Sequence, residues 1–378
     1  GVAFAFGLER RTEKLNLETD TAFSTGDLFG QGGPTIGVAG QTTSNEYFLE
    51  ARAPLIEGRP MAHLLSVNAS YRNSDYSTGI KTDTYGLGLE WAPIREARFR
   101  GSYQRAARAA NVIELFRAQG IALYDNDADP CAGATPTATL AQCARTGVTA
   151  AQYGTILDSP AGQYNYLQGG NPKLKAEESD SYTLGAVFTP SNNFNATIDV
   201  FRMSVDKVID ILPPNITLQQ CITTGQFCNL INRDRLGTLW ATPAAFIVGT
   251  NDNLGKRTTS GVDLGANYMV RLQNYGSLMF NFLGTFLKEF KNQPIPGLPD
   301  YDCAGLHGGT CGAPAPEWRH KLRATWSTPW KVDVALTWRY IGSVDHERTS
   351  SNPQLNGAVF EADKTLGARD YFDLYASW

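Results

Sequence analysis

Apolar and polar residues alternate along much of the chain. Leu65, Val67, Ala69 and Tyr71, for example, are separated by single serine or asparagine residues. Successive side chains of a β-strand point to opposite faces, so a period of two predicts strands with one apolar and one polar face. The pattern recurs in about twelve segments, at residues 1–14, 44–54, 65–72, 85–91, 95–104, 182–188, 194–205, 261–270, 277–289, 318–327, 332–340 and 370–378.

The segments between these strands differ strongly in length. Short turns, such as residues 57–60, 190–193 and 273–276, are expected to alternate strictly with long polar loops. Transmembrane barrels have short turns at the periplasmic end and long loops outside the cell. A soluble β-sandwich explains the alternation equally well but not the difference in loop length. We therefore expect an all-β, antiparallel transmembrane β-barrel.

One predicted strand changes phase within its length. In residues 194–205, Phe194, Ala196, Ile198 and Val200 form the apolar set, and Phe201, Met203 and Val205 then replace it. A β-bulge near residues 200–202 would produce this shift.

Composition agrees with many strands joined by turns. The 378 residues include 37 Gly, 16 Tyr, 18 Phe and 7 Trp but only 4 Met. No apolar run is as long as a membrane-spanning helix requires. The net charge of −4 argues against a nucleic-acid partner, which would usually need a concentrated basic face.

The six cysteines fall into three close pairs, each inside a predicted loop. Such spacing favours small loop disulfides and an oxidising compartment, although six free thiols remain an alternative. Zinc binding is disfavoured because no pair has the Cys-x2-Cys spacing. The pairs are Cys131 with Cys143, Cys221 with Cys228, and Cys303 with Cys311.

Charged residues gather on the polar faces of the predicted strands. In a barrel this face lines the lumen, where a basic row could attract an anionic chelate or, as we favour, pair with acidic neighbours in water. The row consists of Arg319, Lys321, Arg323 and Arg339. Aromatic residues near strand ends would form interfacial girdles, among them Trp91, Tyr103, Trp326, Trp338 and Tyr340.

Three segments resemble the barrel signatures of TonB-dependent outer-membrane receptors. They are SYQRAARAANVIELF at residues 102–116, GNPKLKAEESDSYTLG at 170–185 and TTSGVDLG at 258–265. Ala110 and Ala176 stand where the family usually has proline. With the strand rhythm, the resemblance covers essentially the whole chain, residues 1–378.

The resemblance implies a multi-pass barrel of about 22 strands in the Gram-negative outer membrane, with a plug domain inside. It also implies a TonB box that contacts the TonB complex, outer-membrane lipid around the barrel and no cofactor. About twelve strands are present here, so we expect a fragment that lacks the plug and the last strands and leaves two open edges.

The implied function is active uptake of a scarce small-molecule solute, such as a ferric siderophore or an oligosaccharide. The sequence does not identify that solute. Loop aromatics are candidate ligand contacts because rings stack on many solutes, although packing within the loops explains them as well. These aromatics are Tyr124, Tyr153, Tyr164, Tyr166, Trp240 and Tyr301.

Other functions are weaker. A passive porin or an autotransporter barrel fits the strands but not the long motif-bearing loop. An enzyme is not expected, because only four His are present and no Gly-x-Ser-x-Gly elbow occurs. The acidic run at residues 125–129 lacks the full spacing of a calcium loop, so we interpret it as a solvated loop and expect no metal site.

Overall fold

The computed structural model describes residues 1–28, 33–126 and 128–378. Its elements are β1 (Ala3–Leu17), α1 (Thr21–Thr25), β2 (Val38–Arg59), β3 (Ala62–Tyr76), β4 (Lys81–Ile94), β5 (Ala97–Arg108), α2 (Val112–Phe116), β6 (Gly120–Asp125), α3 (Leu140–Arg145), β7 (Gln163–Gly169), β8 (Glu177–Ser191), β9 (Phe194–Asp206), β10 (Ile209–Ile211), α4 (Pro214–Thr224), η1 (Cys228–Leu230), β11 (Ile231–Asn232), β12 (Phe246–Asn253), β13 (Lys256–Arg271), η2 (Gln273–Tyr275), β14 (Ser277–Gln293), β15 (Tyr301–Asp302), β16 (Leu306–His307), β17 (Trp318–Ser327), β18 (Asp333–Ile341), β19 (Val344–His346), η3 (Glu347–Thr349), η4 (Glu361–Asp363), β20 (Thr365–Leu366) and β21 (Arg369–Ser377).

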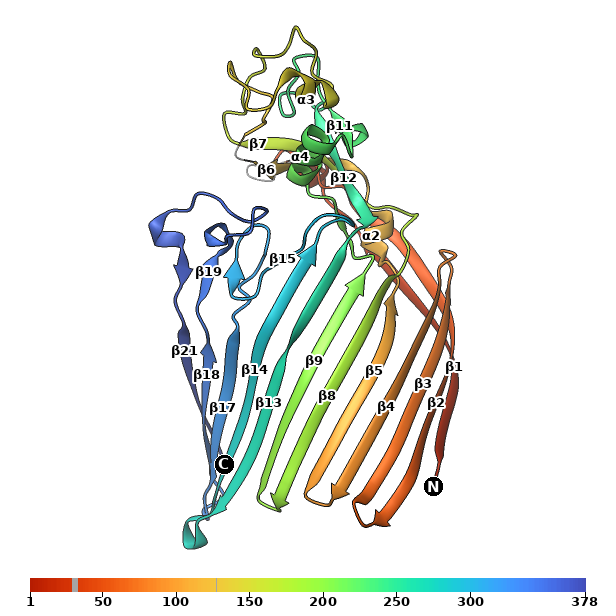
Figure 1. Ribbon diagram of the computed structural model, residues 1–378, viewed down its shortest axis with the longest axis vertical. Coiled ribbons are helices and arrows are strands. Elements are labelled where there is room, and N and C mark those ends of the chain that lie inside the picture. The colour runs from red at the N-terminus through yellow and green to blue at the C-terminus, as the bar shows by residue number, and fades with distance from the viewer. Residues whose placement is uncertain (29–32, 127) are drawn as a thin grey trace.

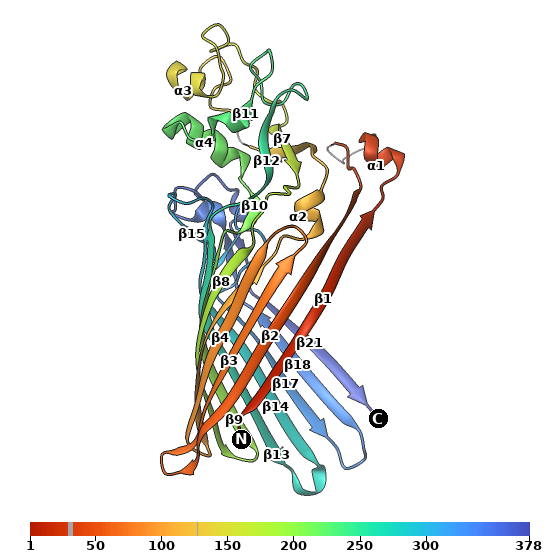
Figure 2. The same cartoon turned by 90° about the vertical axis from the view of Figure 1, so that its right-hand side faces the viewer.

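Twelve long strands form one curved wall. Their order is β1-β2-β3-β4-β5-β8-β9-β13-β14-β17-β18-β21, and each pairs antiparallel with the next. Figures 1 and 2 show these strands tilted side by side, with the irregular segments gathered at one end. Every strand expected from the alternation pattern is present, which confirms the all-β antiparallel fold.

The outer face of the wall is apolar and carries an aromatic row. Tyr47, Tyr71, Tyr85, Tyr103 and Tyr182 lie on successive strands from β2 to β8. Ring centroids are 6.1 Å apart for Tyr47 and Tyr71, 6.1 Å for Tyr85 and Tyr103, and 5.0 Å for Tyr103 and Tyr182. A tyrosine ring has an apolar body and a polar tip, which suits the boundary between hydrocarbon and headgroups.

Two hydroxyl groups of this row have carboxylate partners on the long-loop side. Tyr71 donates to Asp83 over 2.6 Å and Tyr103 donates to Asp180 over 2.7 Å. The row therefore divides an apolar lower band from a charged upper band on the same face.

The inner face carries charges that pair across strands. Arg100 on β5 makes two hydrogen bonds to Asp199 on β9, of 2.8 and 2.7 Å. Gly185 lies between them in the sheet, and a Cβ atom there would come within 1.9 Å of the Asp199 carboxylate. Glycine at this position therefore permits the ion pair.

The predicted bulge near residues 200–202 is wrong. Strand β9 pairs with β13 from Phe194 to Asp206 without a register shift. The shift lies instead between β13 and β14, where Ser260 pairs with Glu289 and Gly261 with Leu287. The apolar set changes in β9 because Arg202 points outward and bonds Glu289 over 3.2 Å, in the charged band.

The strict alternation of short turns and long loops is also wrong at one place. Only residues 77–80 connect β3 to β4 at the long-loop end. The backbone N–H of Tyr76 donates to the carbonyl of Ile80, which closes this connection as a tight turn. The other connections at that end are longer. They comprise residues 18–37, 109–176, 207–255, 294–317 and 342–368.

In the part of the chain that the structure describes, the helices are too short and too polar to span a membrane.

The two faces of the wall give a direct test of which one contacts hydrocarbon. Leu184 on the outer face and Leu283 on the inner face are similarly exposed, at 67% and 59%. Leu184→Arg in the full-length protein should cost about 2–4 kcal/mol of unfolding free energy in bilayers, because arginine is expensive on a lipid-facing strand. Leu283→Arg, facing water, should cost less than about 1 kcal/mol. Equal costs in urea titrations would contradict the assignment of the faces.

Candidate functional site

Two long connections fold together above the wall. Residues 109–176, between β5 and β8, and residues 207–255, between β9 and β13, form one loop domain (Figures 1 and 2). Its sheet has the order β10-β12-β7-β6, so strands from both connections share it. Strands β7 and β12 are parallel, with Tyr166 opposite Ile247 and Gly169 opposite Thr250. Backbone hydrogen bonds therefore join the two loops.

The loop domain is fastened to the wall at a junction of charged side chains. Arg108, the last residue of β5, bonds Glu177 at the start of β8 over 2.6 Å and Glu114 in α2 over 2.9 Å. Glu177 also accepts the backbone N–H of Ile209 over 2.7 Å, which adds the second loop. Asn111 caps α2 and forms a capping box with Glu114.

A close glycine contact and a buried apolar cluster make this junction compact. A Cβ atom on Gly170 would lie 2.7 Å from the backbone of Leu115, so only glycine permits this approach. Ala110, Leu115, Leu174 and Ile209 form a buried cluster beneath it. The first two receptor-like sequence motifs therefore meet here, where both loops leave the wall.

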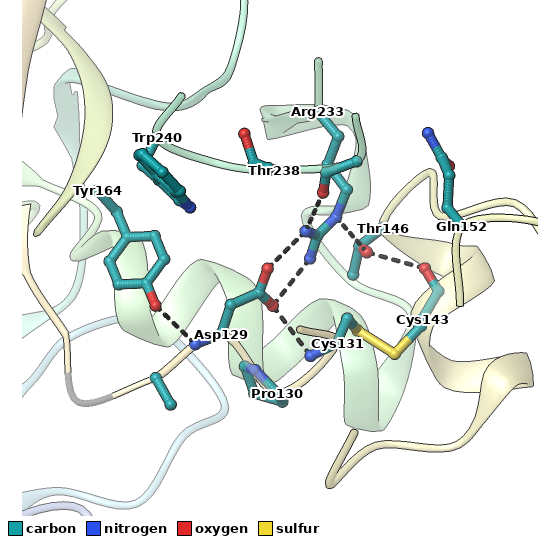
Figure 3. Close-up of polar contacts among 12 residues, drawn as sticks. Asp129, Pro130, Cys131, Cys143, Thr146, Gln152, Tyr164, Arg233, Thr238 and Trp240 are labelled. Atoms are coloured by element: carbon teal, nitrogen blue, oxygen red, sulfur yellow. Dashed lines mark hydrogen bonds and ion pairs between the residues drawn. A yellow bond between two sulfur atoms is a disulfide. The ribbon is translucent and has the colours of Figure 1, made fainter. Parts of the chain in front are cut away.

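A buried ion pair lies at the centre of the loop domain (Figure 3). Arg233 and Asp129, from different loops, are 2.5 Å apart, and their side chains are only 3% and 2% exposed. Arg233 also donates to Thr146 over 2.9 Å and to the carbonyl of Gly237 over 2.7 Å. Asp129 accepts the backbone N–H of Cys131 over 3.0 Å. Our interpretation of residues 125–129 as a solvated loop is therefore wrong for Asp129, and Asp127 lies outside the described residues.

The three predicted disulfides are present. The Cα atoms are 5.6 Å apart for Cys131 and Cys143, 4.8 Å for Cys221 and Cys228, and 5.5 Å for Cys303 and Cys311. The first two bonds lie within the core of the loop domain, one in each loop. They fix local turns, whereas the ion pair and the shared sheet join the loops to each other.

Five of the six aromatic residues predicted as ligand contacts come together in the loop domain. Tyr164 is 2% exposed, and its hydroxyl oxygen accepts the backbone N–H of Asp129 over 3.0 Å. Tyr153 donates to the carbonyl of Ala138 over 2.8 Å, and Trp240 donates to that of Leu157 over 3.1 Å.

Tyr124 stands between the rings of Tyr164 and Tyr166, at centroid distances of 5.8 and 6.2 Å. Its hydroxyl is buried without a hydrogen-bond partner among the described residues. Burial raises the pKa values of Tyr124 and Tyr164 above their usual range. Most of these rings therefore pack inside the loop domain. Tyr124 also lines the large cavity described next.

A large cavity lies between the loop domain and the two C-terminal long loops. Its volume is about 2220 Å³, and its walls come from α4, β16, η3 and the segments around them. Tyr301, the sixth predicted aromatic, lines it and packs on Cys303, Cys311 and Leu355. Burial raises the pKa of Tyr301 above its usual range.

The C-terminal loops are held together by a buried carboxylate. Glu347 accepts the backbone N–H groups of Thr310 and Cys311, at 2.9 and 2.6 Å. A Cβ atom on Gly308 would lie 2.4 Å from this side chain, so the loop can wrap closely only with glycine there. On the parallel strands β16 and β19, His307 and His346 are opposite each other, with ring centroids 5.2 Å apart.

The predicted basic row lies on the inner face of the wall, away from this cavity. Arg339 bonds Asp373 over 2.9 Å and lies over the ring of Tyr371. Arg323 lies over the ring of Tyr375, 5.6 Å from its centroid. Arg319, Lys321 and Arg339 line a second cavity of about 560 Å³.

Two features of the site were missed in the sequence. Asp129 and Arg233 are 104 residues apart in the chain, and neither stands in a distinctive local pattern. Asn165 is a further link that was not predicted, because its side-chain amide donates to the carbonyls of Thr242 and Ala245, over 3.0 and 2.9 Å. Within residues 1–28, 33–126 and 128–378, no three or more His, Cys, Asp or Glu side chains are grouped to hold a metal ion.

Because of this ion pair, we expect the stability of the loop domain to depend strongly on Asp129. Asp129→Asn keeps the side-chain shape but leaves the Arg233 charge buried without a counter-charge, which should cost about 3–5 kcal/mol. Pulse proteolysis of the full-length protein would measure this loss through cleavage within residues 109–176. Asp125→Asn is the matched control, because Asp125 is exposed and bonds only Gln163, over 3.2 Å, among described side chains. Equal cleavage of both variants would contradict the role of the pair.

The two buried tyrosines should respond differently to loss of their hydroxyl groups. Tyr164→Phe removes the acceptor for the Asp129 N–H and should destabilise the loop domain by about 1 kcal/mol. Tyr124→Phe removes a hydroxyl without a partner and should leave stability unchanged or slightly higher. Thermal unfolding of both variants, followed by intrinsic fluorescence, would check this order, and a larger loss for Tyr124→Phe would refute it.

Comparison with known proteins identifies the family to which this β-barrel wall belongs. A family model described as TonB dependent receptor-like, beta-barrel, matches residues 3–378. A search of curated proteins found no match.

Several solved structures are similar to the chain. The ferric enterobactin receptor PfeA of Pseudomonas aeruginosa, solved as a mutant, is 14% identical over 99% of this chain and 43% of that chain, with a TM-score of 0.60. The siderophore receptor PirA of Acinetobacter baumannii is 12% identical over 99% and 45%, with a TM-score of 0.55. The FrpB iron transporter of Neisseria meningitidis is 12% identical over 100% and 46%, with a TM-score of 0.51.

At such identities the likeness to solved structures shows the fold alone, and the chain spans less than half the length of each of these proteins. The family model, in contrast, covers almost every residue. The chain therefore belongs to the TonB-dependent receptor family, whose members are transporters and not enzymes, and it forms part of the family's β-barrel.

Proposed function

We propose that this chain is the barrel portion of a receptor that actively takes up a scarce solute across the Gram-negative outer membrane. The solute is captured at the long-loop end and passes through the lumen. The energy comes from the TonB complex, through a plug domain and TonB box elsewhere in the same protein. Outer-membrane lipid surrounds the apolar face.

The observation that carries the proposal is the cavity of about 2220 Å³ beneath the loop domain. Ligand sites are concave and combine apolar surface with a few oriented polar groups. This cavity has both, because Phe290 and Tyr301 line it together with Arg257 and Glu347. Its walls come from both connections of the loop domain and from both C-terminal long loops, so a bound solute would contact four loops.

The solved relatives suggest candidate solutes. PfeA is named as a ferric enterobactin receptor and PirA as a siderophore receptor, and one PfeA mutant was solved in complex with enterobactin. A ferric siderophore is therefore a first probe for this chain, and an oligosaccharide, which the sequence resemblance also implies, is the second.

Energy dependence separates this proposal from a passive porin. The full-length receptor would be expressed in a Gram-negative host with and without functional TonB, and uptake of radiolabelled ferric enterobactin and of labelled neutral oligosaccharides would be followed. We expect receptor-dependent accumulation of at least one probe, lost almost completely without TonB. Accumulation that needs the receptor but not TonB would contradict active transport, and so would the absence of accumulation of both probe classes.

A further inference from the structure

The charges around the large cavity limit the kind of solute that fits. The lining contains three basic residues, Lys256, Arg257 and Arg348, and four acidic ones, Asp125, Asp210, Glu347 and Asp363, so the balance is 3 − 4 = −1 with His neutral. A binding site for a multiply charged anion needs an excess of positive charge, since complementary potentials attract the ligand and match it. The cavity has no such excess among its described lining residues.

The basic side chains of the cavity are also engaged by the protein. Lys256 forms an ion pair with Asp206 at 3.2 Å. Arg257 donates to the side chain of Asn292 over 2.8 Å and lies 3.9 Å from Asp210. Arg348 donates to the carbonyl of Ala358 over 3.0 Å. An anionic chelate would have to compete with these partners.

The neutral part of the lining has a different character. Eight lining residues are Asn or Gln, and four are aromatic. Five of the amides already donate to carbonyl or sulfur atoms of the loops: Asn126, Asn292, Gln293, Asn352 and Gln354. Among the described residues, the NH₂ groups of Asn215, Gln219 and Gln220 on α4 make no such hydrogen bond, so α4 offers its amides to a solute. A side-chain amide both donates and accepts hydrogen bonds, which suits hydroxyl groups that do the same. Phe360 is 82% exposed on the cavity wall, and such an apolar ring offers a flat surface to the C–H face of a sugar.

The size of the cavity indicates an extended solute. Pockets for small molecules usually measure about 300–1000 Å³. The cavity here is about 2220 Å³ and reaches from the loop domain to the C-terminal loops. It has room for several linked rings.

Resting on the proposed uptake function, we infer that the cavity binds a polyhydroxylated oligomer without net negative charge, that is, a neutral oligosaccharide. The amide groups of α4 recognise its hydroxyls, and Phe360 recognises its ring faces. The predicted basic row belongs to the inner wall of the barrel and takes no part in this first contact.

Binding to the purified full-length receptor tests the inference. An array of neutral glucose and N-acetylglucosamine oligomers, with their sulfated and uronic-acid counterparts, would be probed, followed by titration calorimetry of the tightest neutral binder and of ferric enterobactin. We expect neutral oligomers to bind best, with an affinity nearly independent of salt, because no net charge is screened. Phe360→Ala should weaken this binding about tenfold through loss of ring stacking.

Tyr275→Ala is the matched control, because Tyr275 is also an exposed aromatic but lies at the short-turn end of the wall, and it should leave the affinity unchanged. Preference for anionic glycans or ferric enterobactin, failure of every neutral oligomer to bind, or equal effects of the two variants would overturn the inference. TonB-dependent uptake of ferric enterobactin would then still support the proposed transport function.

Discussion

A buried charge is tolerated only beside its partner, and this constraint organises the long-loop end of the molecule. Arg233 and Asp129 are almost completely buried and come from two different loops. Neither loop could bury its charge alone without a large desolvation cost. The pair therefore requires the loops to fold together. The parallel pairing of β7 with β12 adds backbone hydrogen bonds between the same two loops. Around this centre the two disulfides and the aromatic rings pack as one core.

This loop domain is connected to the wall through the residues that carry the receptor-like motifs. Arg108 and Glu177 end β5 and begin β8, and they also bind α2 and the second loop. The wall thus supplies a rigid base, and the loops supply a cavity that faces the C-terminal loops. In the function that we propose, such an arrangement would separate two tasks: the loops would capture the solute above the membrane, and the charged inner face would line its passage.

The strands could be predicted from the sequence because their signal is local. A period of two is visible within a few residues, and the Cys pairs are only 7 to 12 residues apart. The false bulge near residues 200–202 arose because a strand that leaves the apolar band changes its polarity in the same way as a strand that slips in register. The outward Arg202 and its partner Glu289 show which of the two occurs here.

The interior of the loop domain could not be predicted in this way. Asp129 looked like one member of an acidic run, and its partner lies in another loop. Tyr153, Tyr164 and Trp240 belong to residue types that are common both in binding sites and in cores, so their identity alone did not separate the two roles. Only the three-dimensional arrangement shows that their polar atoms bond carbonyl and N–H groups of the loops.

The central claim is that residues 109–176 and 207–255 behave as one folding unit. Native-state hydrogen exchange of the full-length receptor, read by mass spectrometry, tests it most directly. The account predicts that peptides covering β7 and β12 exchange with the same free energy of opening, and that Arg233→Met lowers both together. Protection of one strand that persists while the other exchanges freely would contradict the claim.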